Sequence, residues 1–321
     1  MSAQRRPGLA SVIVPCWNQL EFTRQCLPSL MRHTRTPWEL IVIDNGSTDG
    51  TSLYLAGVCD GGTVPVRVIT NERNLGFPAA VNQGLRDARG DYLVLLNNDV
   101  VFTDGWLDQL VALVESSPTI GLAGPMSNFA SPPQLVEQAP YRDLNEMRAF
   151  AHRWREEHRG QWLTPTKLSG FCLLMKRALY ETIGGLDERF ELGFFDDDDL
   201  GIRARRAGYE PAIAHDLFVH HFGARTFQGN GVDSDALLEA NLKRFTEKWG
   251  EAFAPVERRA IVPWQGSDLG GGGSEGPAYT NTTRPKVSLT MIVRNEEANL
   301  PHCLGSAAGL FDEIVIVDTG S

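Results

Sequence analysis

Acidic and amide side chains follow two short apolar runs in the first hundred residues. Asp44 opens the segment DNGSTD after the run LIVI, where a carboxylate can accept hydrogen bonds from a base or a ribose. Asn97-Asn98-Asp99 follows the run YLVLL, and its carboxylate can place one hard oxygen ligand on Mg²⁺ or Mn²⁺. Each segment also has a structural interpretation, because Asp and Asn are typical of helix caps and turns. Alone, neither position decides between binding and local structure.

The densest group of titratable residues is the run Asp196–Asp199. Mutual repulsion among four carboxylates raises their pKa values unless a nearby cation or metal offsets it. A helix start also favours acids, but four in succession favour a functional role. Two adjacent histidines, His220 and His221, follow the apolar run LFV. Either histidine could be a metal ligand or a packed core residue, and the pair alone does not decide.

These residues need structural elements that bring them together. Four apolar runs are typical of buried strands: Ser11–Val14, Leu40–Ile43, Val66–Ile69 and Tyr92–Leu96. Helices are expected between and after them, at Leu20–Arg32, Gly50–Ala56, Pro78–Ala88 and Asp104–Glu115. The alternation predicts an α/β fold with a doubly wound, mostly parallel sheet. In such sheets ligands bind beyond the carboxyl ends of the strands, which is where Asp44 and Asp99 fall.

The pattern is looser after Pro125, where a proline-rich stretch gives no clear element. Further along we expect helix Asp143–His158, strand Leu168–Met175, helix Asp198–Ala207, strand Ala212–Val219 and helix Asp235–Trp249. These segments complete a first domain over residues 1–264.

The composition limits the classes of function. The 321 residues carry a formal charge of −10, which argues against a nucleic-acid partner, because such binding needs basic surface. The five cysteines are scattered without a CxxC pair, which predicts a reducing compartment and neither a zinc site nor a disulfide framework. We find no signal peptide, and no apolar run approaches the roughly 20 residues of a membrane span. We therefore expect a cytoplasmic protein.

The C-terminal part of the sequence repeats its beginning. Residues 265–285, with the run GSDLGGGGSEG, have the composition of a flexible linker. After it, SLTMIVRNEEANLPHCL and DEIVIVDTGS correspond to SVIVPCWNQLEFTRQCL and WELIVIDNGSTD near the start. Two strands and one helix cannot bury a core of their own. We therefore interpret residues 286–321 as the start of a second, truncated copy within a longer two-domain polypeptide.

Seven segments in order give the chain a resemblance to a known family. They are VPCWNQ, LIVIDNGSTDGT, NERNLGFPAAVNQGL, DYLVLLNNDVV, LSGFCLLMKRALYETIGGLDERF, FFDDDDLGIRARRAGY and VHHFGART. Together they resemble glycosyltransferase family 2. The resemblance implies the GT-A fold, a Rossmann-like, doubly wound and mostly parallel sheet with a smaller acceptor-side subregion. It also implies an inverting transferase that uses a nucleotide sugar.

The resemblance implies roles for individual residues as well. The nucleotide sugar would be bound by residues near the strand ends: Pro15, Trp17, Asn18, Asp44, Arg73, Asn74, Gly76, Asn82, Asn97, Asn98, Gly170 and Phe171. Asp99 lies at the end of the family's DxD position and would ligate a divalent metal, Mn²⁺ or Mg²⁺. Because Asn97 replaces the first acid, either the metal affinity would be lower or the metal dependence would be weaker than in a full DxD enzyme. His221 has the spacing of the family's late histidine, commonly a third metal or phosphate contact, with His220 as the fallback.

Asp196-Asp197 stands in the place of the family's Glu-Asp pair, with Asp197 as the general base for an acceptor hydroxyl. The implied partners are a nucleotide-diphosphate sugar donor and a glycan or glycoconjugate acceptor; a lipid-linked acceptor would bring the protein to a membrane surface. A nucleotidyltransferase and a non-catalytic sugar-nucleotide or glycan-binding module, partnering a second catalytic glycosyltransferase domain, remain open. The intact acidic run and histidine favour the enzyme, because a binding copy would be free to lose its base.

Overall fold

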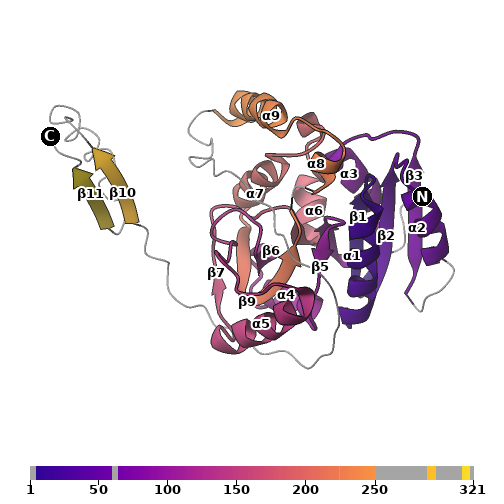
Figure 1. The fold of residues 1–321 in the computed structure, drawn as a ribbon, viewed down its shortest axis with the longest axis horizontal. Coiled ribbons are helices and arrows are strands. Elements are labelled where there is room, and N and C mark those ends of the chain that lie inside the picture. The colour runs from indigo at the N-terminus through magenta and orange to yellow at the C-terminus, as the bar shows by residue number, and fades with distance from the viewer. Residues whose placement is uncertain (1–4, 60–63, 224, 251–287, 294–312, 319–321) are drawn as a thin grey trace. The chain divides into compact units, whose positions relative to one another are not determined.

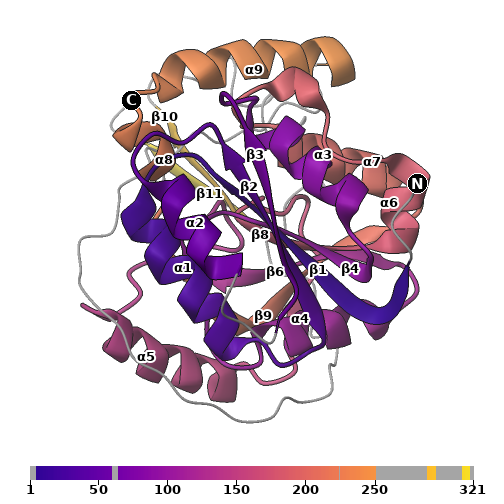
Figure 2. The same cartoon turned by 90° about the vertical axis from the view of Figure 1, so that its right-hand side faces the viewer.

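The computed structural model describes residues 5–59, 64–223, 225–250, 288–293 and 313–318. The chain divides into two compact units, residues 1–281 and 282–321. The first unit contains a mixed sheet with the strand order β3-β2-β1-β4-β8-β6-β9-β5, covered by helices on both faces (Figures 1 and 2).

Four parallel strands form the half of the sheet that the sequence predicts. They are β1 (Arg6–Cys16), β2 (Trp38–Asn45), β3 (Val66–Asn71) and β4 (Gly90–Leu96). Every residue of β2 is buried, as expected for a strand covered on both faces. The register sets Cys16 opposite Asp44 and Asn45 opposite Asn71. The strands therefore end at one common edge, where the polar segments follow.

The other half of the sheet was only partly predicted. Strand β8 (Cys172–Lys176) runs antiparallel between β4 and β6 (Ile120–Ser127), and β9 (Glu210–His221) runs parallel to β6. The short strands β5 (Val100–Val101) and β7 (Trp162–Leu163) pair with β9. Strand β8 begins four residues later than the predicted Leu168, because Leu168–Phe171 forms a loop instead.

Strand β6 was not predicted, because its glycines and proline weaken its strand pattern. The glycines are required by close packing. A Cβ at Gly121 would lie 2.7 Å from the Tyr209 ring, and one at Gly124 would lie 2.8 Å from Gln134 Nε2. The glycines of β6 are therefore explained by tertiary packing, which the local sequence pattern does not reveal.

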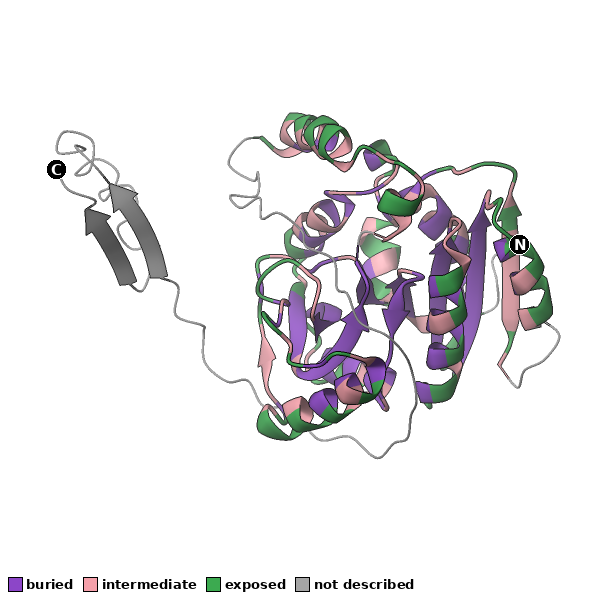
Figure 3. Ribbon diagram, viewed as in Figure 1, coloured by how far each residue is buried: buried purple, intermediate pink, exposed green. Residues whose placement is uncertain are grey.

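Two apolar cores flank the sheet. One face is covered by α1 (Leu20–His33), α2 (Thr51–Cys59) and α4 (Trp106–Glu115). The other is covered by α3 (Phe77–Asp87), α5 (Leu144–Glu157), α6 (Arg177–Ile183) and α7 (Asp196–Arg206). Strand β1 shows the alternation, since Val12 and Val14 enter the first core and Ile13 the second. Figure 3 shows the buried strands between helices whose outer surfaces are exposed.

The acidic run begins a helix, α7, two residues earlier than predicted, so all four acids lie in its first turn. A short 3₁₀ segment (Glu188–Phe190) precedes it, and α8 (Arg225–Gly229) and α9 (Ser234–Trp249) follow β9. Among the helices that the structure describes, none is long and apolar enough to cross a membrane. Cys16, Cys26 and Cys172 are buried free thiols.

The second unit contains a parallel pair of strands, β10 (Ser288–Val293) and β11 (Glu313–Asp318). The predicted linker, residues 265–285, and the remainder of residues 286–321 lie outside the described residues. The predicted boundaries at 264 and 286 stay predictions.

Candidate active site

Asp99 and His221 face each other at the common edge of the sheet. Asp99 follows β4 and is 4% exposed, and its Oδ1 lies 3.1 Å from His221 Nε2 at the end of β9. Asn97 Nδ2 lies 3.5 Å from the same nitrogen. Asn98 turns to the opposite side, where its Nδ2 donates to Thr23 Oγ1 at 2.9 Å. Asn97 and Asp99 therefore share one face, and Asn98 packs against α1.

The imidazole of His221 is held in one orientation. Its Nδ1 donates to the Phe129 carbonyl at 2.8 Å, and its ring stacks on Phe171 with centroids 4.9 Å apart. Nε2 is thereby directed at Asp99. Burial lowers the pKa of His221, but the charge and hydrogen bond of Asp99 outweigh burial and hold that pKa above its ordinary value.

The donor set at this point fits a divalent cation. A carboxylate oxygen and an imidazole nitrogen are suitable ligands for Mn²⁺, and a metal-binding histidine characteristically donates its other N–H to a carbonyl. Asp99 Oδ1 and His221 Nε2 would both be acceptors if Nε2 carried no proton, so their approach to 3.1 Å requires either a proton on Nε2 or a cation bound to both atoms. In the part of the chain that the structure describes, no group of three or more His, Cys, Asp or Glu residues forms a metal cluster. The protein would supply two ligands here, leaving other positions for phosphate oxygens.

His220 lies on the other face of β9. It is fully buried, and its Nδ1 lies 2.7 Å from the Tyr141 hydroxyl oxygen. Burial, followed by the neighbouring His221 and Arg225, lowers the pKa of His220 to about 3. The alternation of the strand thus separates the two histidines and brings His221 to Asp99.

Asn128, which the sequence analysis did not select, holds the backbone of His221. Its Oδ1 accepts from the His221 N–H at 3.0 Å, and its Nδ2 donates to the His221 carbonyl at 3.0 Å. Asn128 follows β6 as Asn97 follows β4. Its position after a strand could have identified it, had β6 been recognised.

Asp197 is joined to the same edge through two consecutive residues. Its Oδ2 accepts the Gly170 N–H at 2.9 Å. The next residue, Phe171, stacks on His221, and its carbonyl accepts the Asn97 N–H at 2.9 Å. A Cβ at Gly170 would lie 3.3 Å from Asp197 Cβ, so a larger residue would crowd this contact. Gly170-Phe171 therefore links the acidic turn to the edge that holds Asp99 and His221.

Two of the four acids are paired with cations. Asp199 is fully buried and contacts Arg203 and Lys248, and Asp198 lies 3.1 Å from Lys167. Burial and the charge of Asp197 raise the pKa of Asp198 to about 6, although Lys167 partly opposes them.

Asp196 and Asp197 are different, because no salt bridge joins either of them to a cation among the described residues. Burial, and then the charge of Asp197, raise the pKa of Asp196 well above its ordinary value. The acidic turn therefore holds two carboxylates that make no ion pair with a described residue beside two that do.

The residues after β1 and β2 form a connected turn. Asn18 Oδ1 accepts from the Thr48 N–H at 2.7 Å. Asp44 is 1% exposed, and its carboxylate accepts from the Ser47 N–H at 3.0 Å and from the Ser52 hydroxyl. Asp44 therefore stabilises the turn after β2, as its structural interpretation predicts. Its contact with a base or a ribose stays a prediction.

Pro15 and Trp17 lie at the end of β1, beside the segment that follows α8. Asn230 Nδ2 donates to the Trp17 carbonyl at 3.3 Å, and its Oδ1 accepts from Asn18 Nδ2 at 2.5 Å. Asn230, in the segment after β9 and α8, thus contacts the residues that follow β1.

The loop after β3 is fixed to the end of β2. Asn45 Nδ2 donates to Asn74 Oδ1 at 2.7 Å, and that oxygen also accepts the Gly76 N–H at 2.8 Å. Gly76 has φ +91°, and a Cβ there would lie 2.1 Å from the Glu191 carbonyl oxygen. The loop thus reaches the segment before α7, with the Arg73 side chain exposed.

Asn82 is not directed to this edge. Its Oδ1 accepts from the Leu186 N–H, and its Nδ2 donates to the Leu186 carbonyl and to Glu188 Oε1, each at 2.9 Å. This geometry makes Asn82 an anchor for the segment that precedes the acidic turn.

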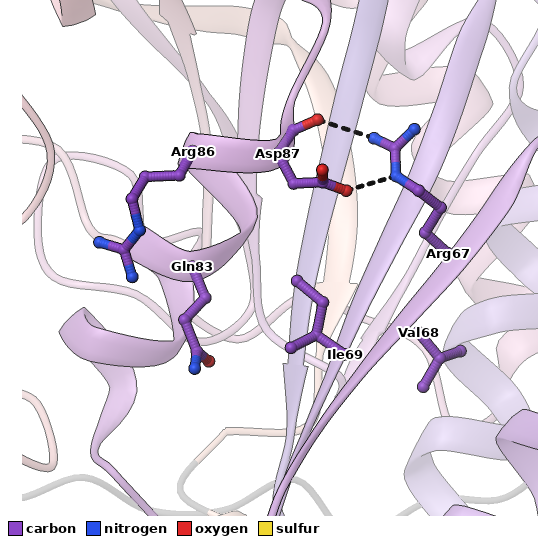
Figure 4. A pocket seen from close by; sticks show the side chains of 6 residues that line it. All are labelled: Arg67, Val68, Ile69, Gln83, Arg86 and Asp87. Atoms are coloured by element: carbon purple, nitrogen blue, oxygen red, sulfur yellow. Dashed lines mark hydrogen bonds and ion pairs between the residues drawn. The ribbon is translucent and has the colours of Figure 1, made fainter. Parts of the chain in front are cut away.

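A depression of about 480 Å³ lies elsewhere, along β3 and α3 (Figure 4). It is lined by Arg67, Val68, Ile69, Gln83, Arg86 and Asp87, none of which is a predicted site residue. Arg67 is already paired with Asp87 at 2.5 Å and with Glu39 at 3.1 Å. The depression therefore adds no chemistry to the candidate site.

The fold defines the class of protein. The structure matches that of the mannosyltransferase PcManGT from Pyrobaculum calidifontis, solved in complex with GDP-Man and Mn²⁺, with a TM-score of 0.55 and 19% identity. The match covers 81% of this chain and 68% of that one. The predicted GT-A glycosyltransferase fold is thereby confirmed.

The profile described as Glycosyl transferase family 2 matches residues 11–184, more than half of the chain. The chain belongs to this family, and its first unit is a glycosyltransferase domain.

Two relatives show how far the similarity extends. The uncharacterised protein y4gI of Sinorhizobium fredii is 30% identical over 211 residues, which are 63% of this chain but only 23% of y4gI. The N-acetylglucosaminyl-diphospho-decaprenol L-rhamnosyltransferase of Mycobacterium tuberculosis is 29% identical over 243 residues, 68% of this chain and 76% of that protein. The chain thus spans less than a quarter of the length of y4gI.

Proposed function

We propose that residues 1–264 transfer a sugar from a nucleotide-diphosphate sugar to a hydroxyl group of a glycan or glycoconjugate, with inversion at the anomeric carbon. The observation that carries the proposal is the connection between two chemical centres. Gly170 donates to the Asp197 carboxylate, and the adjoining Phe171 stacks on His221, which faces Asp99. These contacts support a proton acceptor that is linked to a cation-binding pair through two consecutive residues at the carboxyl edge of the sheet.

Asp99 and His221 are the residues that would hold Mn²⁺ or Mg²⁺. When bound, the ion would neutralise the charge that develops on the departing nucleoside diphosphate. The Mn²⁺ named in the structure of the mannosyltransferase supports this assignment. The predicted contacts of the nucleotide sugar with Pro15 to Asn18, Asp44 and the loop 73–76 belong to the same proposal.

Asp197 acts as the general base. The acceptor oxygen forms a bond to the anomeric carbon while the bond from that carbon to the diphosphate oxygen breaks, and the hydroxyl proton passes to the Asp197 carboxylate. Its Oδ2 is fixed by the Gly170 N–H at 2.9 Å, which orients the carboxylate before the acceptor arrives. A single displacement by the acceptor oxygen inverts the anomeric carbon, so one base is sufficient and no covalent intermediate is needed.

The acceptor class can be narrowed by one relative. The mycobacterial protein is named for a sugar carried on diphospho-decaprenol. We propose an acceptor of this kind, a sugar on a lipid diphosphate, which would bring the enzyme to a membrane surface.

Titration with UDP, GDP and dTDP, with and without Mn²⁺, tests this function. The nucleotide that binds identifies the sugar nucleotides whose turnover is then measured by release of the nucleoside diphosphate. Metal-dependent binding with turnover is the expected result. Binding without turnover, in the presence of sugar–lipid diphosphate acceptors, would favour a binding module, and absence of binding would contradict both.

Asn128→Ala should weaken metal-dependent nucleotide binding by about tenfold, because residues that orient a metal ligand typically contribute 10–100-fold to affinity. The loss follows from releasing both hydrogen bonds to the His221 backbone. Calorimetry with Mn²⁺ measures it, and the exposed Asn145→Ala on α5 is the control. Unchanged affinity in Asn128→Ala would show that Asn128 does not orient the ligand.

We further propose that residues 286–321 begin a second copy of the domain. The support is the strand register. Ser288 pairs with Glu313 and Val293 with Asp318, as Ser11 pairs with Glu39 and Cys16 with Asp44 in β1 and β2. The sequence correspondence is thus repeated in the pairing of two parallel strands.

Limited proteolysis should cut first within residues 265–285, because that composition is typical of a flexible linker. The product should be a stable fragment of about residues 1–262, identified by intact mass. First cleavage between residues 11 and 227 would contradict the proposed domain boundaries.

A further inference from the structure

The segment just before the acids has an unusual backbone. Glu191, Phe194 and Phe195 have φ values of 49°, 69° and 67°. Residues with a Cβ rarely adopt this left-handed region, and such conformations persist only where the surroundings hold them. The position of Asp196 and Asp197 therefore depends on contacts made to residues 190–195.

Helix α9 supplies those contacts. Asn241 is fully buried, and its Nδ2 donates to the Phe190 carbonyl at 2.8 Å and to the Gly193 carbonyl at 2.6 Å. Its Oδ1 accepts from Arg244 at 2.7 Å, and Arg244 also reaches Glu191 at 2.6 Å. One amide thus fixes both ends of a tight turn, and its orientation is itself fixed from the same helix.

The same helix holds the far side of the acidic turn. Phe245 packs against Phe195 and Phe190, with ring centroids 5.3 and 6.4 Å apart. Lys248 and Trp249 contact Asp199, the acid that is also paired with Arg203. Apolar packing and ion pairing by α9 therefore hold Phe195 and Asp199, which lie on either side of the remaining three acids of the turn. Residues 234–249 lie beyond the 11–184 match to the family profile.

We propose that α9 is the positioning element of the acidic turn and that Asn241 is its principal positioning residue, acting through the Phe190 and Gly193 carbonyls to hold Asp197 toward the acceptor. This inference rests on the proposed function, since it assigns a helix outside the family match to the general base.

Asn241→Ala removes both donated hydrogen bonds and tests the inference in the full chain. The probe is whichever sugar nucleotide of the UDP, GDP and dTDP series the wild type binds, with Mn²⁺. We expect kcat to fall by about tenfold or more, because small displacements of a reacting group are costly, while KM for the donor changes by less than about twofold. The expected change in hydrogen exchange is faster exchange across residues 187–199 with β1 to β4 unchanged.

Two control variants separate positioning from general loss of stability. Lys243→Ala changes an exposed residue of α9, and Val114→Ala weakens the core at α4. Neither should lower kcat, although Val114→Ala should lower the melting temperature. Equal exchange changes in the central strands, or an unchanged exchange in 187–199, would overturn the role of Asn241.

Comparison with Asp197→Asn separates failure of the positioning role of Asn241 from failure of the proposed function. If Asp197→Asn loses turnover and Asn241→Ala keeps it, the positioning role is wrong and the proposed function stands. If both variants keep turnover, the general base itself is wrong. The exchange measurement gives a result for Asn241 even where turnover is too slow to follow.

Discussion

Asp197→Asn should lower turnover by at least about two orders of magnitude while leaving donor affinity and melting temperature nearly unchanged, because loss of a general base costs about 10²–10⁴ in rate. The amide keeps the size of the carboxylate, and its oxygen can still accept the Gly170 N–H, although the amide nitrogen cannot accept the Asp198 N–H as the second carboxylate oxygen does. It cannot accept the acceptor's proton. Steady-state kinetics with the donor identified by titration, together with thermal unfolding, measures both parts of the prediction.

The neighbouring acids are the matched controls. Asp198→Asn should have a milder effect, since Asp198 is paired with Lys167, and Asp196→Asn should also be milder. If Asp197→Asn keeps activity and Asp196→Asn loses it, the base is the neighbouring residue. If all three variants keep activity, the acidic turn is not catalytic and the general base lies elsewhere.

Asp99→Ala should abolish the metal-dependent part of nucleotide-diphosphate binding and leave the fold intact. Asp99 supplies the only carboxylate that faces His221 Nε2 within 4.0 Å in the described part of the chain, at 3.1 Å. With one of two protein ligands removed, the ion is left with the imidazole alone. Calorimetry with and without Mn²⁺ measures the difference, and circular dichroism reports the fold.

Asp235→Ala, an exposed acid in the first turn of α9, is the control for loss of one negative charge. It should leave the affinity unchanged. An Asp99→Ala variant that still binds the nucleotide as tightly with Mn²⁺ as the wild type does would refute the metal-binding role.

Much of the fold could be read from local sequence. The runs that became β1, β2 and β4 are nearly all apolar, as a strand buried on both faces is whatever its neighbours are. The run Val66–Ile69 also became a strand, β3, but it contains Arg67 and is half-buried at the end of the sheet rather than buried as predicted. The polar segments after them fell at one edge because parallel strands end together. Strand β6 could not be predicted in the same way, since Gly121 and Gly124 are small where other elements approach, and that need is not local.

By itself the sequence determined the chemistry available to this protein: an aspartate after the fourth strand, a run of four acids and a late histidine, in an order typical of one transferase family. Only the tertiary structure decided which of them meet. The alternation of β9 turns His221 toward Asp99 and His220 into the core, and pairing of Val100 with His221 sets the level at which they face. Asn128 contacts His221, 93 positions away, and Asn241 contacts Phe190, 51 positions away. Contacts between residues so far apart in sequence depend on how the elements pack, so local sequence could not predict them.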